Sequence, residues 1–306
     1  MNSIVDTIKA RALKLGFDDC GIASIHDTVE DAEIFKAWLS RGYHANMQYM
    51  ESNMDVRTNP TLFHANAKSI IVVVQNYHQQ PSVWNSSYGV AMFARFSDYH
   101  HSIKNRLGML LEEIRRINPQ LNGSISVDSA PVLERYWAVK AGLGFIGQNT
   151  MFIHPKLGSF VFLGTIVVDQ WLEPDAPNTD RCQNCGKCIA ACPNGALEQP
   201  FTLNARKCIS YQTIEKNNDE LLDADIDVNN QIFGCDICNM VCPHNQDAIQ
   251  SKVFKSDNSI CLLTDDEWDN VASSRFKRLF ASTPIKRIGV KGIRRNISHV
   301  KKNREE

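Results

Sequence analysis

In the first part of the chain, segments whose apolar residues have helical spacing alternate with the continuous apolar runs that are typical of buried strands. Residues 4–15 carry an apolar side chain every three or four positions, which predicts an amphipathic helix that ends at Gly16. Residues 20–23 and the β-branched run 70–74 are apolar without a break, as strands covered on both faces usually are. We expect the run 70–74 to form the centre of a sheet.

Helices and strands continue to alternate beyond this run. A helix is predicted from Asp98, a suitable N-cap, to Ile117. Residues 124–128 alternate like a strand and would bring Asp128 to its carboxyl end, where α/β sheets place chemistry. A further helix is predicted over residues 132–141.

Three glycines after this helix match the spacing of a dinucleotide-binding loop: Gly142, Gly144 and Gly147. Such a loop must follow a strand and open a helix, whereas this one follows a helix and precedes a strand-like stretch. We therefore interpret the glycines as positions where the backbone comes close to something bulky. Residues 149–168 are predicted to form a β-hairpin. The pattern as a whole predicts an α/β (α+β) domain with a central sheet over residues 1–173.

Composition and charge add expectations about size, location and partners. The chain has 306 residues, of which 43% are hydrophobic, enough for two or so domains with their own cores. The first thirty residues contain neither a secretory signal nor a membrane span, so we expect a cytoplasmic monomer with no membrane partner. Residues 275–304 hold eleven Lys and Arg and no acidic residue, which leaves 22 basic against 34 acidic residues elsewhere. A polyanion such as RNA is one explanation, and a solvated helical face is the other.

Eight of the ten cysteines fall within residues 182–242. The first group has the spacing C-x2-C-x2-C-x3-C-P and comprises Cys182, Cys185, Cys188 and Cys192. The second has the spacing C-x2-C-x3-C-P and comprises Cys235, Cys238 and Cys242, with Cys208 between the groups. Thiolates two residues apart can share a metal centre, while the cysteine before the proline reaches a second centre. This is the arrangement of a ferredoxin with two clusters.

In this arrangement each of the eight thiolates belongs to one of two clusters. One 4Fe-4S cluster would be held by Cys182, Cys185, Cys188 and Cys242, and the other by Cys192, Cys208, Cys235 and Cys238. Zinc sites usually repeat C-x2-C with histidine options, and cluster thiolates need a reducing compartment, which argues against disulfides. Buried structural cysteines are the remaining alternative. We expect a ferredoxin-like domain over residues 174–250 and a basic helical segment over 251–306 that packs back on the body and contacts RNA.

Several segments of the chain resemble the epoxyqueuosine reductase family. They are residues 97–100, 127–135, 140–144, 158–169, 206–215, 234–238 and 285–289. The resemblance implies a cobalamin-dependent enzyme, fed by two 4Fe-4S clusters, that reduces the epoxide of epoxyqueuosine at the tRNA wobble position to give queuosine. It also implies an external electron donor, for which we expect a flavodoxin or a ferredoxin. The alternative is a corrinoid iron-sulfur reductase of a small molecule, similar to the reductive dehalogenases, and a pure electron carrier would leave residues 1–180 unexplained.

The resemblance also implies roles for individual residues. Asp128 aligns with the family's proton donor, so we expect it to be buried against the cofactor, shielded from cations and raised in pKa. The alternative role for Asp128 is an ionised N-cap of the helix at Pro131. Implied cofactor contacts are Arg57, Ser97, Asp128, Asn149, Phe152 and Leu163. Tyr211 and His244 each lie beside a cluster ligand and could stand between cluster and corrinoid, or could simply pack.

Two features depart from the family. Family members often continue into helical repeats that help to hold tRNA, whereas this sequence stops at Glu306. We therefore expect the segment from Arg275 onward and the surface of the α/β domain to make the tRNA contacts, with an affinity for tRNA that is lower or depends more on salt. His244 stands where the family tends to have tryptophan, which affects only local packing.

Overall fold

A four-stranded sheet forms the base of the molecule in the computed structural model, which describes residues 3–25, 29–79, 83–254 and 258–305. The strand order is β1–β2–β7–β4, and every neighbouring pair is antiparallel. The strands are β1 (Asp19–Ser24), β2 (Ser69–Asn76), β7 (Val161–Val168) and β4 (Gly123–Ser126). All eight residues of β2 are buried, which confirms the prediction that residues 70–74 are central.

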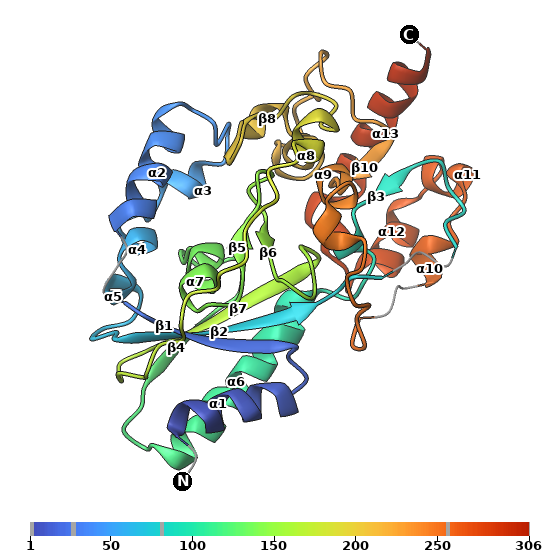
Figure 1. Cartoon of the computed structure of the whole chain (residues 1–306). Helices are drawn as coiled ribbons and strands as arrows, with labels where there is room; N and C mark the ends of the chain where they lie inside the picture. The colour runs from blue at the N-terminus through green and yellow to red at the C-terminus, as the bar shows by residue number, and fades with distance from the viewer. Residues whose placement is uncertain (1–2, 26–28, 80–82, 255–257, 306) are drawn as a thin grey trace.

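Helices cover both faces of this sheet, as Figure 1 shows. Helices α1 (Ile4–Lys14) and α6 (Tyr99–Ile117) lie on one face, and α7 (Glu134–Lys140) lies on the other. Side chains of β2 alternate between them, because Ile71 and Val73 belong to the first core and Val72 to the second. Burial on both faces explains why β2 is a continuous apolar run. The predicted helices 4–15, 98–117 and 132–141 are confirmed.

The predicted hairpin over residues 149–168 is wrong. Strand β6 (Phe152–Ile153) pairs with β5 (Phe145–Ile146), whereas β7 pairs with β2 and β4. Strand β7 is apolar on both faces, so it buries more apolar surface inside the main sheet than it would in a two-stranded hairpin. A Cβ atom at Gly144 would overlap the carbonyl oxygen of Ile153, so the bulky neighbour expected near these glycines includes the chain's own backbone.

A lobe of short helices stands beside the sheet. It consists of α2 (Val29–Ser40), α3 (Gln48–Glu51), α4 (Met54–Thr58) and α5 (Pro60–Phe63). Several hydrogen bonds attach this lobe to the cysteine-rich segment. Among them, Trp38 Nε1 donates to the Leu203 carbonyl, the Tyr43 hydroxyl donates to Glu198, and the Ala205 amide donates to the Tyr43 carbonyl. The lobe and the cysteine-rich segment therefore hold each other in place.

The cysteine-rich segment is built from elements of two to five residues joined by loops. They are α8 (Lys187–Ala190), β8 (Leu197–Gln199), β9 (Thr202–Leu203), η2 (Ala205–Lys207), the π-helix η3 (Tyr211–Glu215), β10 (Gln231–Phe233), α9 (Ile237–Met240) and η4 (Pro243–Asn245). Strand β10 pairs in parallel with β3 (Gly89–Val90), which is followed by η1 (Met92–Ala94). The segment is thus tied to the N-terminal half of the chain by backbone as well as side-chain bonds.

The C-terminal helices pack back on the body. They are α10 (Asn258–Cys261), α11 (Asp265–Asp269), α12 (Ser273–Phe280), η5 (Pro284–Ile288) and α13 (Gly289–Glu305). Trp268 stacks on Phe280 with ring centroids 5.3 Å apart, and Ile297 of α13 joins the same core as Val90 and Phe233. None of the helices in the described ranges is both long enough and apolar enough to span a lipid bilayer.

Many cations of the C-terminal segment bond to the body. Lys286 pairs with Asp98 at 2.9 Å, and Arg287 pairs with Glu215 at 2.6 Å. Lys291 likewise pairs with Asp219 of the body, whereas Arg275 pairs with Glu267 and Lys301 pairs with Asp269 inside the C-terminal segment. These pairs neutralise part of the positive charge that suggested an RNA-binding surface. The uneven charge of the sequence therefore serves partly to dock this segment.

Two glycines give a matched test of this packing. Gly158 has a φ of +70°, and a Cβ atom there would overlap Oδ1 of Asn245 and lie 3.0 Å from the His244 carbonyl oxygen. Gly158→Ala should lower the free energy of unfolding by about 1–3 kcal/mol because it combines backbone strain with a clash. Gly108 lies inside α6 with nothing within 4 Å of its Cβ position, so Gly108→Ala should raise stability by about 1 kcal/mol. Denaturant unfolding of both variants measures the two effects, and equal effects would contradict the contacts at Gly158.

Candidate active site

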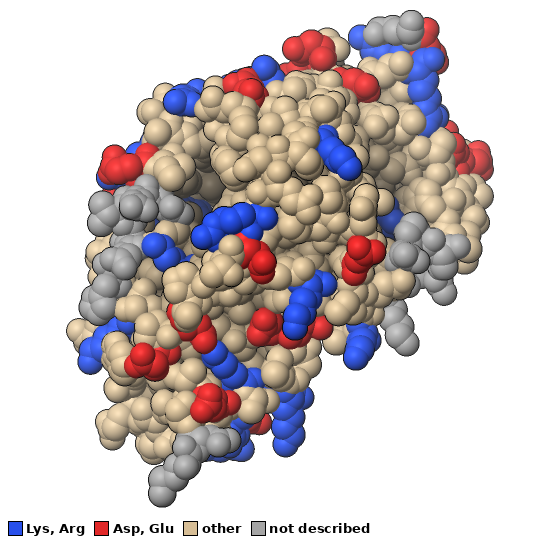
Figure 2. Space-filling view, viewed as in Figure 1, with Lys and Arg blue, Asp and Glu red and all other residues tan. Residues whose placement is uncertain are grey.

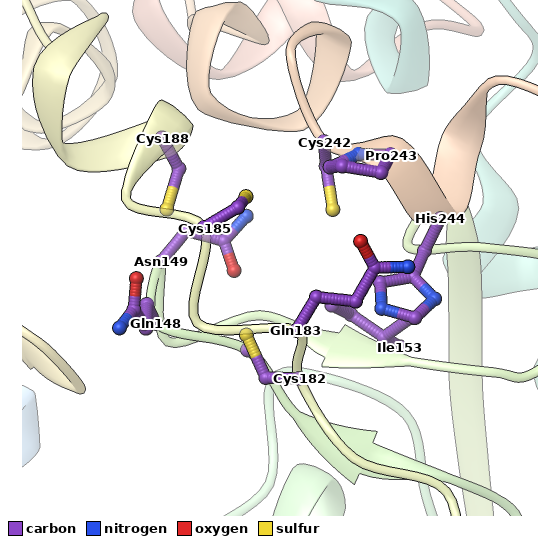
Figure 3. A pocket seen from close by; sticks show the side chains of 11 residues that line it. Gln148, Asn149, Ile153, Cys182, Gln183, Cys185, Cys188, Cys242, Pro243 and His244 are labelled. Carbon is purple, nitrogen blue, oxygen red and sulfur yellow. The ribbon is translucent and has the colours of Figure 1, made fainter.

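One set of four cysteines surrounds a common pocket. Cys182, Cys185, Cys188 and Cys242 line it together with Asn149 and His244. Figure 3 shows the four side chains arranged around the same space. Cys182 and Cys185 come from the loop that leads into α8, Cys188 from α8 itself, and Cys242 from the far side. Cys242 belongs to the second motif in sequence but joins the first set in space. The fold thus places Cys242 beside the first motif, where the predicted crossing of the two motifs requires it.

The other four cysteines form a second set. The thiols that interact with Cys238 electrostatically are Cys235, Cys208 and Cys192, whereas those that interact with Cys242 are Cys182, Cys188 and Cys185. Burial raises the pKa of Cys235 to about 12, so this thiol needs a bound cation to become a thiolate near neutral pH. Cys20 lies apart in the core beneath the sheet, as expected of a packed thiol.

A buried polar network holds the rim of the first set. Asn149 Nδ2 donates to Asn239 Oδ1 at 3.2 Å, and the Ser159 hydroxyl donates to the same oxygen at 3.0 Å. Asn245 donates to the Ser159 hydroxyl and to the Asn239 carbonyl, at 2.8 and 2.7 Å. Asn239 belongs to α9 and lies between Cys238 and Cys242 in the chain, so the network fixes the segment that carries cysteines of both sets. Buried, satisfied amides of this kind rigidify the groups that they join.

The second part of the site lies at the carboxyl end of β4. Asp128 follows this strand with a φ of +56°, and its side chain is 58% exposed. The Tyr99 hydroxyl donates to Oδ2 of Asp128 at 3.1 Å, and Nε2 of His100 lies 3.0 Å from the same oxygen. Nδ1 of His100 lies 2.7 Å from Oδ1 of Asp98, whose other oxygen bonds to Lys286. A chain of polar contacts thus runs from the C-terminal segment to Asp128.

The contacts of Asp128 do not give the raised pKa that we expected. Although the side chain is 58% exposed, nearby protein atoms partly desolvate the carboxyl and favour a raised pKa. The bonds from His100 and Tyr99 and the charge of Arg287 outweigh this effect and lower the pKa. The alternative role as an N-cap is also wrong, because α7 begins after Leu133 and has no side-chain cap bond. Asp128 is therefore an ionised carboxylate that two donors hold in place.

A second carboxyl lies directly behind Asp128 and was missed by the sequence analysis. Glu134 Oε1 accepts hydrogen bonds from the Asp128 amide at 2.7 Å and from the Ser126 hydroxyl at 2.9 Å. Burial and the nearby charge of Asp128 raise the pKa of Glu134 to about 8. An acidic residue in the first turn of a helix is usually a helix-stabilising charge, so its sequence position carried no signal of this contact.

Basic and aromatic side chains approach this carboxylate pair from other elements. Arg57 of α4 donates from Nη2 to the Tyr49 carbonyl, and among the described residues its buried Nε has no hydrogen-bond partner. Tyr49 donates to Glu215, which also accepts from Arg287. Arg57 interacts electrostatically with Glu134. Figure 2 shows the molecule hollowed beside the lobe that supplies Arg57 and Tyr49.

The remaining predicted contacts are spread over both parts of the site. Ser97 is exposed one residue before the N-cap of α6, and Leu163 is half-buried on β7. Phe152 is buried in the core on the α7 face of the sheet. Tyr211 is buried in η3, where its hydroxyl accepts a bond from the Asn46 amide. The structure gathers Arg57 and Asp128 in one region and Asn149 and His244 in the other.

The partly buried ring of His244 packs edge-on against Phe145, with centroids 5.1 Å apart. Its Nε2 has no hydrogen-bond partner among the described residues. A histidine at this position therefore occupies an apolar contact that suits an aromatic ring, which agrees with the expectation of a local packing effect.

Comparisons with known proteins match both parts of the site. The family model described as a 4Fe-4S double cluster binding domain matches residues 181–245, and that described as epoxyqueuosine reductase QueG matches residues 57–129. An epoxyqueuosine reductase of Leadbetterella byssophila is 38% identical over 294 residues, which cover 96% of this chain and 97% of that protein.

Two solved structures show the same fold. A crystal structure of epoxyqueuosine reductase with an epoxyqueuosine-modified tRNA-Tyr stem loop is 27% identical, with a TM-score of 0.87 over 97% of this chain and 80% of that chain. A reductive dehalogenase structure that suggests a mechanism for B12-dependent dehalogenation is 14% identical, with a TM-score of 0.52 over 95% of this chain and 37% of that chain. The second likeness concerns the fold alone.

Proposed function

Because the chain belongs to the epoxyqueuosine reductase family, we propose that it reduces the epoxide of epoxyqueuosine at the tRNA wobble position to give queuosine. The observation that carries this proposal is the placement of Asp128, bonded to His100 and Tyr99, in one body with two four-cysteine sets. A solved relative holds a tRNA stem loop with the epoxide-bearing nucleoside, which supports the substrate.

The reaction accounts for both parts of the site. Opening an epoxide and removing its oxygen as water consumes two electrons and two protons. Two 4Fe-4S clusters, each carrying one electron at a time, would supply the electrons through the ligand sets assigned above. A positioned acid must protonate the departing oxygen, and we assign this role to Asp128. The electrons would come from an external flavodoxin or ferredoxin.

Cobalamin is the cofactor that we propose for the reducing step. When bound, it supplies a low-valent cobalt centre that can react with the substrate carbon. Arg57 has an unpartnered buried Nε and would contact the cofactor together with Ser97, Asp128 and Leu163. A flat macrocycle needs donors and apolar walls, which these side chains and Tyr99 would provide. The fold likeness to a B12-dependent dehalogenase agrees with this proposal.

Phe152, Asn149, Tyr211 and His244 are the less direct assignments. Each is packed against protein groups, so we propose that they shape the region between the clusters and the cofactor through backbone position. The π-helix that begins at Tyr211 agrees with this assignment, because single π-turns are common at functional sites.

The tRNA would lie across the C-terminal segment and the mouth of the α/β domain. Lys277 and Arg278 are exposed on α12, while the apolar side chains Phe276 and Phe280 face the core. Exposed cations of this kind suit contacts to phosphate, which weaken as salt rises. We propose three units on this basis: residues 1–173 for catalysis, 174–250 for the clusters and 251–306 for tRNA contact.

A single assay tests the function. The protein with both clusters and cobalamin is incubated without oxygen with a chemical reductant and tRNA that carries epoxyqueuosine, and the nucleosides are then analysed by mass spectrometry. Loss of one oxygen from epoxyqueuosine is the expected result. Unchanged epoxyqueuosine in the fully loaded protein, with turnover of a halogenated small molecule instead, would favour the corrinoid reductase of a small molecule.

A further inference from the structure

His100 makes contacts at both ring nitrogens that a neutral imidazole cannot satisfy. Nδ1 lies 2.7 Å from Asp98 Oδ1, and Nε2 lies 3.0 Å from Asp128 Oδ2. A neutral imidazole carries only one N–H, so it can donate to only one of two carboxylates. One extra proton must therefore be shared among the three groups.

The neighbours of the two carboxylates decide where this proton resides. Lys286 bonds to Asp98 Oδ2, and the Tyr99 hydroxyl donates to Asp128 Oδ2, so both carboxylates are stabilised as anions. No described residue donates a hydrogen bond to Oδ1 of Asp128, which leaves this oxygen for a ligand. The remaining position for the proton is the imidazole ring.

Other charges act on His100 in both directions. It occupies the second position of α6, whose positive end disfavours an imidazolium ion, and part of its ring is buried. Glu134 adds a third carboxyl nearby, whereas Arg287 and Lys286 add positive charge. Burial lowers the pKa of His100, but the hydrogen bonds that the ring donates to the Asp128 and Asp98 carboxylates outweigh this effect and raise the pKa. Its side chain is 36% exposed, so water can return a proton to it.

We propose that His100 holds the proton before the reaction and that Asp128 passes this proton from His100 to the substrate oxygen. In this step the Nε2–H bond breaks, the Asp128 carboxylate gains the proton, and the Asp128 O–H bond then breaks as the oxygen of the opened epoxide takes it. His100 is left neutral until water reprotonates it, after which the same path delivers the second proton that the oxygen needs to leave as water. The two electrons come from the reductant through the clusters. The inference rests on the proposed function, and it makes His100 a positioning residue that acts through Asp128.

The first test needs no turnover. Protein with both clusters oxidised, labelled with ¹³C in its histidine rings, is titrated by NMR, and the His100 signal is identified by its loss in His100→Gln. His100 should titrate above its ordinary value of about 6.5. Asp98→Asn removes one carboxylate and should lower that midpoint by about one to two pH units, whereas Lys286→Gln should raise it. A midpoint at or below the ordinary value, or no change in Asp98→Asn, would overturn the proposal.

The same variants then serve in the tRNA assay. The single-turnover rate of the wild type should fall as pH rises through the midpoint of the His100 titration. This alkaline limb of the pH–rate profile should lie at lower pH in Asp98→Asn and at higher pH in Lys286→Gln. His100→Gln should slow the reaction by about a hundredfold and lose this limb. A limb that stays in place in both charge variants contradicts the role of His100. Absence of turnover in the wild type would instead contradict the proposed function, and the NMR titration would still decide the position of the proton.

Discussion

Asp128→Asn is expected to stop the reduction of epoxyqueuosine while both clusters and the fold remain. The amide has nearly the same shape and can still accept the Tyr99 hydrogen bond, but it cannot receive a proton from His100 and pass it on. Loss of a positioned proton donor typically costs about 10²–10⁴ in rate. The single-turnover rate on modified tRNA measures the loss, and iron content and thermal unfolding verify the rest.

Asp169→Asn is a matched control for this variant. Asp169 follows the carboxyl end of β7 and accepts hydrogen bonds from Asn122. It lies far from His100 and from the cysteines. The same chemical change there should leave the rate within about twofold of the wild type, because surface substitutions away from special features are usually nearly neutral. Full activity in Asp128→Asn would remove Asp128 from the proton path, and loss of activity in both variants would point to a general structural effect.

The position of Asp128 could be predicted from the sequence, whereas its charge state could not. Alternation over residues 124–128 was enough to place the carboxyl at the end of a strand. Its pKa depends on His100 and Tyr99 from α6 and on Arg287 from η5, and these elements meet only in the folded chain. Reasoning from burial alone gave the wrong direction, because the hydrogen bonds to the charged form outweigh desolvation.

The strands themselves could be predicted from the sequence, whereas the pairing of β7 could not. Apolar runs correctly marked β2 and β7 as strands, since burial on both faces leaves a local signature. The partner of β7 was wrong because a turn at residues 156–159 suggested a hairpin with the preceding stretch. Pairing is decided by which arrangement buries both faces, and that depends on α6 and α7.

The grouping of the cysteines in space was predictable for a different reason. Cluster binding imposes spacing on neighbouring thiolates, so the motif itself carries the chemistry. The supporting contacts carry no such spacing. Asn239 and Ser159 are eighty residues apart and meet only because the turn that precedes β7 lies against α9 in the folded chain. Glu134, likewise, becomes significant only once its contact with the Asp128 amide is known.

The second large effect is expected from crossed ligation, in which the last cysteine of each motif belongs to the cluster of the other motif. It can be tested one cluster at a time. Cys242→Ala should destroy or degrade the cluster held by Cys182, Cys185 and Cys188, because it removes one of the four thiols that line that pocket. Cys192→Ala should affect the other cluster instead, although Cys192 belongs to the first motif in sequence. In each variant about half of the iron should be lost, and reduction of the tRNA should fall below detection because the electron path is broken.

Electron paramagnetic resonance of the reduced variants distinguishes the two clusters, and iron and sulfide analysis counts them. Cys20→Ala is the matched control, since this buried thiol lies in the core beneath the sheet, apart from both sets, and its loss should leave both signals intact. If Cys242→Ala and Cys235→Ala removed the same signal, the second motif would hold its own cluster and the crossing would be wrong. If Cys242→Ala and Cys188→Ala remove the same signal, the pocket in Figure 3 is the site of one complete cluster.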